Sequence, residues 1–216
     1  MSEEIITSNH WLVITNPTAG KRKFQEQSKF VRSQLDKAQI PYIFKVTEYS
    51  GHAIEIARFY AKRDCLNFLI LGGDGSVSEV INGIFIAAPE DTSKIKIAIL
   101  PRGTGNDWGR FWKLKKNDKE SMKVFFTGKS KLIDIGQIEY FDKNREENTR
   151  FFINSIGFGL DAEVADLTHR LKKYMGSFSL LYTLALILAV FKYKSVKASL
   201  ILDEEERPVN LFTMNI

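Results

Sequence analysis

The protein has 216 residues, of which 44% are hydrophobic and 26% are charged, and its formal net charge is +5. This composition fits a globular chain of one large domain or one and a half ordinary ones, and it excludes fibrous and disordered classes. Cys65 is the only cysteine, which excludes an intramolecular disulfide and a multi-cysteine metal site. Residues 1–10 lack the pattern of a secretory signal, and the longest apolar run, 178–191, is too short to span a bilayer. We therefore expect a cytoplasmic protein.

Four short apolar runs in the first half of the chain are typical of strands covered on both faces. They are residues 11–15, 42–46, 68–71 and 95–100. Segments with helical spacing separate them; in 77–85, for example, apolar side chains recur every three or four residues. The alternation predicts an α/β fold, with a three-layer N-terminal domain around a parallel sheet over residues 1–130.

The pattern changes after about residue 131. Runs 133–140 and 151–156 are joined by the charged segment 142–150, which predicts an antiparallel hairpin, and runs 196–202 and 209–216 with the segment 203–208 predict another. Helical patterns at 161–171 and 177–191 lie between the hairpins. We expect residues 131–216 to form an incomplete, mainly β domain, an antiparallel sandwich with helices.

The apolar helix expected at 177–191 has two interpretations. Its large side chains recur at helical spacing; they are Leu180, Leu181, Leu184, Ile187, Leu188 and Phe191. Together with the lysines that follow, they suit a helix facing a membrane surface. The same spacing is typical of core packing, which we favour. The positive net charge is likewise better explained by lysines on solvated faces than by an anionic partner, and no nucleic-acid-binding motif is present.

The most informative segment lies where an apolar run ends and a helical pattern begins. It reads Gly72-Gly73-Asp74-Gly75-Ser76. Adjacent glycines let backbone N–H groups converge on an anion, and a helix start adds positive charge for a phosphate. Asp74 would repel phosphates unless it acts through a divalent cation or orients a hydroxyl, which indicates Mg²⁺-nucleotide chemistry. In the structural alternative, Ser76 and Glu79 form a capping box on an ordinary turn. No Gly-Lys-Ser/Thr follows, which excludes a Walker A loop.

Two further segments follow apolar runs and combine glycine with polar side chains. One is Asn16-Pro17-Thr18-Ala19-Gly20, and the other is Gly103-Thr104-Gly105-Asn106-Asp107. In the second, the glycines permit close approach to a ligand, and Thr104 and Asn106 offer neutral hydrogen bonds. Alternatively, Asn106 or Asp107 is only the N-cap of the next helix. Because ligands of parallel sheets bind beyond the carboxyl ends of the strands, we expect the three segments to meet at one edge.

The order of these segments resembles the diacylglycerol kinase catalytic domain family, which includes sphingosine, ceramide and bacterial lipid kinases. The resemblance covers residues 11–216. It is carried by Asn16-Pro17-x-x-Gly20, Gly72-Gly73-Asp74-Gly75-Ser76 with Glu79 and Asn82-Gly83, and Pro101-x-Gly103-Thr104-x-Asn106-Asp107. Later landmarks are Asp134-Ile135-Gly136, Asn154 and Gly157-Phe158-Gly159-Leu160-Asp161. Ser76 stands where threonine is commoner and keeps the hydroxyl.

The resemblance implies a role for each segment. Nucleotide contacts would come from Asn16, Pro17, Thr18, Ala19, Gly20, Thr47 and Thr104. Phosphates would be held by Gly72, Gly73, Asp74, Gly75, Ser76 and Glu79. Asp74 would be the catalytic residue, acting on a phosphate, on Mg²⁺ or on the substrate hydroxyl. Asn106 and Asp107 would bind the substrate, although Asp107 could instead cap its helix.

The function implied is an ATP- and Mg²⁺-dependent lipid kinase that phosphorylates a hydroxyl of a diacylglycerol-like or sphingoid lipid. Its partners would be the lipid and, transiently, the inner membrane face; a homodimer is compatible with the sequence. One alternative is a soluble kinase of the NAD kinase or phosphofructokinase type, which shares a Gly-Gly-Asp-Gly loop. Another is a nucleotide-binding module without catalysis. The segments at Asn16 and Gly103 favour the lipid branch.

The last residues, 209–216, read as a strand still running where the sequence stops. The resemblance implies further strands, an acidic general base and a segment for a structural metal site beyond residue 216, and no metal ligands can be assigned within 1–216. Asp74 and Asp107 are the only substitutes for the base within range. We therefore expect these 216 residues to bind nucleotide without completing turnover.

Overall fold

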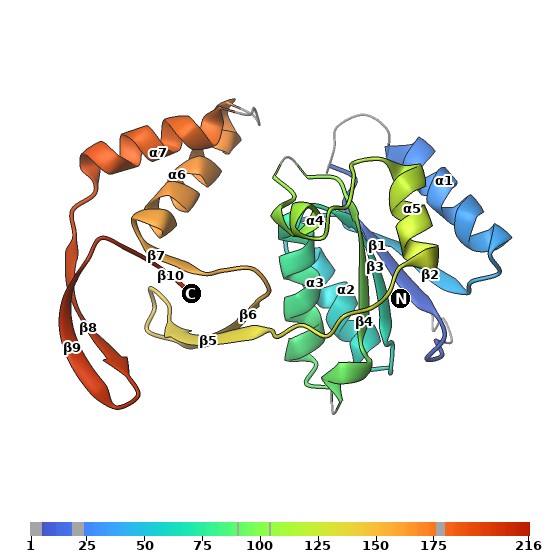
Figure 1. The fold of residues 1–216 in the computed structure, drawn as a ribbon, viewed down its shortest axis with the longest axis horizontal. Coiled ribbons are helices and arrows are strands. Elements are labelled where there is room, and N and C mark those ends of the chain that lie inside the picture. Colours follow the sequence, from blue (N-terminus) through green and yellow to red (C-terminus); the bar gives the residue numbers. More distant parts are fainter. Residues whose placement is uncertain (1–5, 19–23, 90, 104, 176–179) are drawn as a thin grey trace. The chain divides into compact units, whose positions relative to one another are not determined.

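The computed structural model describes residues 6–18, 24–89, 91–103, 105–175 and 180–216. In its first compact unit, residues 1–153, a four-stranded parallel sheet has the order β2-β1-β3-β4 (Figure 1). The strands are β1 (Trp11–Thr15), β2 (Tyr42–Val46), β3 (Asn67–Gly72) and β4 (Lys96–Pro101). The expected α/β fold with a parallel sheet is confirmed, and the bounds of β1 and β2 agree with those expected from the apolar runs.

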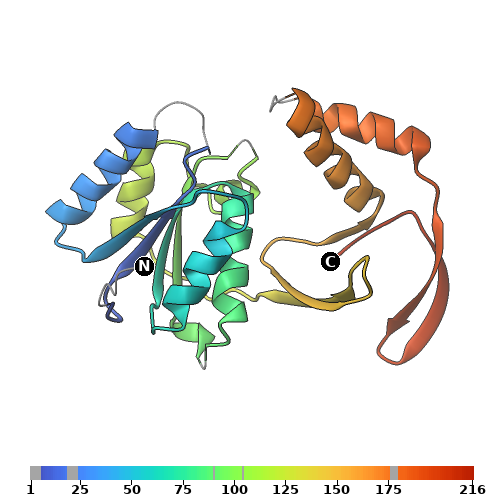
Figure 2. The ribbon, with the colours of Figure 1, turned by 180° about the vertical axis from the view of Figure 1, so that it is seen from behind.

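Helices cover both faces of this sheet (Figure 2). The covering helices are α1 (Phe24–Lys37), α2 (His52–Ala61), α3 (Asp74–Ile86) and α5 (Asp118–Thr127), and the unit also contains the short 3₁₀ helix η1 (Thr92–Lys94) and α4 (Asp107–Phe111). The core around Phe68 and Ile70 packs against α2 and α3, and the core around Leu69 and Leu71 packs against α1 and α5. Successive residues of a strand point to opposite faces, so β3 contributes to both cores, and all six of its residues are buried.

Helices α2 and α3 approach each other closely at Gly83. A β-carbon at Gly83 would lie 2.7 Å from the β-carbon of Ala57 and would also overlap the carbonyl oxygen of Ile54. Both obstacles belong to α2, and one of them is backbone, so neither can move aside cheaply. Glycine is therefore required at this point for the two helices to pack as they do.

We expect Gly83→Ala to lower the free energy of unfolding by about 1–3 kcal/mol, because the added methyl forces the helices apart. At an open helical position the same change would raise stability by up to about 1 kcal/mol. Gly75 is the matched control, since a β-carbon there meets nothing within 4 Å. Urea unfolding of both variants is the measurement, and equal midpoints for Gly83→Ala and wild type would contradict the close packing.

The hairpin of β5 (Gly136–Phe141) and β6 (Glu147–Phe152) completes the described part of this unit. The sequence assigned 142–150 to the connection, and this is wrong for 147–150, which lie in β6. The strand β6 cannot be recognised from an apolar pattern, because much of the β5–β6 pair is exposed to solvent and carries charged side chains. The true turn is shorter: the Asp142 carboxylate accepts the N–H groups of Asn144 and Glu146.

Asn82 of α3 binds β6 to the rest of the first unit. Its side-chain amide donates to the carbonyl oxygen of Phe151 at 2.8 Å and accepts from the N–H of the same residue at 3.0 Å. A further bond runs from its amide nitrogen to the carbonyl oxygen of Ser78. Asn82 is 2% exposed, and these bonds satisfy the hydrogen-bonding groups that its burial removes from water.

The second compact unit, residues 154–216, contains antiparallel strands and two helices. The pair β7 (Gly157–Gly159) and β10 (Thr213–Asn215) and the pair β8 (Val196–Leu202) and β9 (Glu205–Leu211) accompany α6 (Leu160–Met175) and α7 (Leu181–Lys192). The connection expected at 203–208 is only two residues long, because Asp203 and Glu204 both have positive φ and close a tight hairpin turn. This corrects residues 205–208, which lie in β9.

The face that α7 buries differs from the one expected. Leu181, Ala185 and Ala189 are buried, and Ala185 and Ala189 pack against α6 residues such as Val164. Of the six large side chains assigned to the core, five are exposed at least in part, and Phe191 is 86% exposed. Core packing is therefore wrong for those five and correct for Leu181. No helix among the described residues meets the length and hydropathy needed to cross a bilayer.

The compact units divide between residues 153 and 154. The domain boundary expected from the sequence lies between residues 130 and 131, and the β5–β6 hairpin falls between the two positions. The bonds from Asn82 to Phe151 explain why the hairpin groups with the first unit. The boundary at 130/131 stays a prediction.

Candidate functional site

Four loops leave the same edge of the parallel sheet. The last residues of the strands are in register there: Thr15 pairs with Val46 and with Leu71, and Gly72 pairs with Pro101. The expected convergence of the three polar segments at one edge is therefore confirmed for their described residues. The strand order reverses between β1 and β3, and ligands of such sheets bind at this reversal.

The loop after β1 is shaped by Asn16. Its N–H donates to the carbonyl oxygen of Leu71, extending the ladder toward β3. Its side-chain oxygen accepts from both the N–H and the hydroxyl of Thr18, at 2.9 and 2.7 Å, which forms a tight Asx turn. Asn16 therefore fixes the backbone as far as Thr18. Ala19 and Gly20, two predicted nucleotide contacts, lie outside the described residues.

Helix α3 begins directly after β3, with Gly73 as its N-cap and no side-chain hydrogen bond at the cap. The capping box suggested by Ser76 and Glu79 is therefore absent from this helix, which starts three residues earlier than that pairing requires. Ser76 instead packs against Gly72, where a β-carbon would overlap it. A helix start without a side-chain cap keeps its first N–H groups available to an anion.

Glu79 reaches across to another loop. One of its carboxylate oxygens accepts the N–H of Gly51 at 3.0 Å. Gly51 is the N-cap of α2 and has a φ of 89°, a conformation that favours glycine. Glu79 thus joins the first turns of α3 to the loop after β2, and Thr47 in that loop is bound to β1 through its N–H and the carbonyl oxygen of Thr15.

The loops after β3 and β4 touch through glycine backbones. A β-carbon at Gly73 would lie 2.8 Å from the α-carbon of Gly103, so neither position has room for a side chain. Asn106, in a left-handed conformation with φ of 52°, accepts the N–H of Gly103 and donates to its carbonyl oxygen, both at 2.6 Å. The structure gives Asn106 a loop-shaping role, and direct substrate contact stays a prediction. Thr104 lies outside the described residues.

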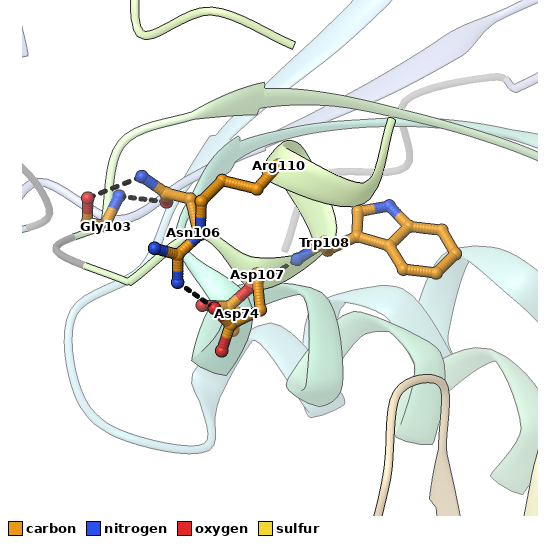
Figure 3. A network of polar contacts seen from close by, with 6 residues as sticks. All are labelled: Asp74, Gly103, Asn106, Asp107, Trp108 and Arg110. Carbon is orange, nitrogen blue, oxygen red and sulfur yellow. Dashed lines mark hydrogen bonds and ion pairs between the residues drawn. The ribbon is translucent and has the colours of Figure 1, made fainter. Parts of the chain in front are cut away.

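Asp74 connects the same two loops, and Figure 3 shows it beside the start of α4. Its Oδ1 accepts the N–H of Trp108 at 3.1 Å, and a β-carbon at Gly105 would lie 3.2 Å from its Oδ2. Asp107 is the first residue of α4, is paired with Arg110, and has a 67% exposed side chain. Asn106 holds the N-cap position, as the structural alternative expected, although it makes no side-chain cap bond; Asp107 is not the cap.

A cavity of about 240 Å³ opens beside this edge. Its walls include six of the predicted site residues: Asn16, Pro17, Thr18, Thr47, Ser76 and Glu79. They also include residues that the sequence analysis missed: Ile14, Glu48, Tyr49, Ser50 and Ala53. The signal that could have found them is position, since 48–50 directly follow Thr47 at the carboxyl end of β2. Asp74, Asn106 and Asp107 are outside its walls; Asp74 and Asn106 belong to the adjoining loop contact.

The donor groups present are compatible with a metal ion that arrives with a nucleotide. The described residues contain no group of three His, Cys, Asp or Glu side chains able to hold a metal. Mg²⁺ in kinases is commonly bound by one or two carboxylates together with substrate phosphates, so a lone Asp74 beside a phosphate-accepting helix start fits that chemistry.

Comparisons with known proteins agree on one family. Residues 10–138 match the family model of the diacylglycerol kinase catalytic domain. A diacylglycerol kinase of Staphylococcus carnosus (strain TM300) is 31% identical over 168 residues, which are 77% of this chain and 51% of the relative. One of Staphylococcus haemolyticus (strain JCSC1435) is 32% identical over 168 residues, 77% and 47% of the two chains. The chain thus spans about half the length of the curated relatives it matches.

Solved structures share the fold. A diacylglycerol kinase structure from Bacillus anthracis (strain Sterne) superposes with a TM-score of 0.62 at 18% identity, covering 96% of this chain and 63% of that one. A second structure from the same strain gives a TM-score of 0.72 at 22% identity, with 96% and 65% covered. At these identities the likeness establishes the fold of the chain.

Proposed function

We propose a function from the premise that the chain belongs to the diacylglycerol kinase catalytic domain family: it is an ATP- and Mg²⁺-dependent kinase that phosphorylates a lipid hydroxyl. The lipid is diacylglycerol-like or sphingoid. In this reaction the bond between the γ-phosphorus of ATP and its bridging oxygen breaks, a bond from the hydroxyl oxygen to phosphorus forms, and ADP leaves. The hydroxyl proton passes to a base.

The observation that carries the proposal is the meeting of the β3–α3 and β4–α4 loops at Gly73 and Gly103. Phosphoryl transfer depends on positioning and charge neutralisation. Bare backbone at the start of α3 suits an anion, and the carboxylate of Asp74 lies within the same loop contact. Phosphates at this helix start would adjoin the cavity walls at Ser76.

Mg²⁺ would supply charge neutralisation on the phosphates when bound with ATP. Asp74 would be its protein ligand, or would orient the lipid hydroxyl. The hydrogen bond from Trp108 N–H to Oδ1 fixes the side chain, so the carboxylate is held in place before the nucleotide arrives.

Family membership is the support for two parts of the proposal: that the phosphoryl acceptor is a lipid, and that the lipid comes from a membrane surface. Relatives named diacylglycerol kinase, and the segments at Asn16 and at Gly103 to Asp107, favour lipid over a soluble acceptor. The exposed apolar side chains of α7, Phe191 among them, would suit transient contact with lipid. The runner-up functions remain a soluble kinase of the NAD kinase or phosphofructokinase type and a non-catalytic nucleotide-binding module.

The test measures transfer of label from γ-labelled ATP by the full-length protein. Diacylglycerol, sphingosine and ceramide are offered in vesicles, and NAD and fructose 6-phosphate in solution. We expect label in the lipid extract, only when Mg²⁺ is present. Label on NAD or on the sugar phosphate would favour the soluble kinase, and ATP binding without any transfer would favour the module.

A further inference from the structure

The cavity is bordered by an aromatic side chain that was not among the predicted site residues. Tyr49 forms part of its wall and is 53% exposed. The Tyr49 ring is stacked on the His52 ring, with centroids 4.5 Å apart and planes 2° from parallel. A half-exposed ring at a cavity wall, supported from behind by a second ring, is a flat surface for another π system.

Hydrogen bonds hold this pair of rings in place. The Tyr49 hydroxyl donates to Glu55 at 2.8 Å, and His52 Nδ1 accepts the N–H of Glu48 at 3.1 Å. The bond to Glu55 is the main cause of a raised pKa of the Tyr49 phenol, so the ring is neutral at physiological pH. Since Glu79 also anchors the N–H of Gly51, the segment between β2 and α2 is fixed before any ligand binds.

The wall of the cavity contains both a helix start that favours phosphate and carboxylates that repel it. Ser76 brings the first turn of α3 into the wall, where backbone N–H groups favour phosphate. Glu48, next to Tyr49 in the loop after β2, contributes a carboxylate to the wall, and Glu55 is bonded to Tyr49. Carboxylates repel phosphates but accept hydrogen bonds from neutral hydroxyl or amino groups. A nucleotide is therefore oriented with its phosphates at α3 and its nucleoside toward Tyr49.

We propose that the ring of Tyr49, backed by His52, is the surface on which the base of the nucleotide stacks. The inference rests on the proposed function, because it takes a nucleoside triphosphate as the ligand. It adds a specificity-determining residue to the site: Tyr49 acts on the base and makes no contact with the transferred phosphoryl group.

The experiment compares two ligands by calorimetry with Mg²⁺ present: ATP, and inorganic tripolyphosphate, which has the phosphates without the base. Tyr49→Ala is expected to weaken ATP binding about 10- to 100-fold, the usual loss for one base stacked on an aromatic ring. Binding of tripolyphosphate should stay unchanged. Tyr49→Phe, which keeps the ring and loses only the bond to Glu55, should bind ATP within about threefold of wild type. Tyr49→Leu, which restores bulk without a π face, should resemble Tyr49→Ala.

Several outcomes would overturn the inference. If Tyr49→Ala binds ATP as tightly as the wild-type protein does, the base does not stack on Tyr49. Because the wild-type protein still binds ATP in that case, the proposed function is not affected. Equal losses of affinity for ATP and tripolyphosphate would show that the substitution disturbs the loop. Such a loss is not specific to the base, so it would also contradict stacking of the base on Tyr49. Wild-type protein that binds neither ligand would overturn the proposed function and this inference together.

Discussion

Asp74→Asn is expected to lower phosphoryl transfer by about 100-fold or more with almost no change in melting temperature. Asparagine keeps a side-chain oxygen that can accept the N–H of Trp108, so the contact between the two loops survives. The negative charge that would bind Mg²⁺ or orient a substrate hydroxyl is lost. The measurements are the rate of label transfer and the thermal unfolding midpoint. ATP binding should also lose much of its dependence on Mg²⁺.

Asp74→Ala is the companion variant, because it removes both the charge and the acceptor. We expect a transfer rate as low as in Asp74→Asn, together with a stability loss of about 1–3 kcal/mol from the unpaired N–H of Trp108. An Asp74→Asn variant that keeps its rate while losing stability would reverse this interpretation. Asp74 would then be a structural residue of the loop contact.

Gly73→Val is expected to abolish measurable ATP binding. Its β-carbon alone would lie 2.8 Å from the α-carbon of Gly103, so a branched side chain must push the β3–α3 and β4–α4 loops apart. The backbone N–H groups at the start of α3 would then no longer face a phosphate held between the loops. Calorimetry on the folded variant is the measurement.

Gly83→Ala is the control that separates this effect from general destabilisation. The substitution strains the same helix where it packs on α2, away from the loops. At a temperature where both variants are folded, Gly83→Ala should bind ATP normally. If Gly73→Val also binds ATP as tightly as wild type, the Gly72–Glu79 segment does not hold the nucleotide.

Much of the first unit could be predicted because local residues determine it. Residues 11–15 and 42–46 are apolar runs that end at polar residues, and they become β1 and β2 with those bounds. Since parallel strands share the direction of their carboxyl ends, the position of the loops at one edge followed. Residues 147–150 were missed because a strand with exposed charged side chains resembles a loop in sequence.

Contacts between distant residues could not be predicted in the same way. The bond from Gly51 to Glu79 and the stacking of Tyr49 on His52 depend on how α2 is set against α3. The capping box failed because a local spacing does not fix where a helix begins. In α7, apolar side chains surround the helix, so periodicity could not select the buried stripe, which is formed at Ala185 and Ala189.

The bonds between Asn82 and Phe151 have a consequence for how the β5–β6 hairpin is aligned. Neighbouring residues of a strand present their N–H and C=O groups to opposite edges, so a single amide can pair with Phe151 but not with Arg150 in the same place. Asn82 thus pairs with the backbone N–H and C=O of Phe151 as one residue of a neighbouring strand would. If β6 slipped by one position, the buried amide of Asn82 would lose its hydrogen-bond partners. Helix α3 therefore selects the register of the β5–β6 hairpin, which would be only marginally stable as an isolated pair of strands.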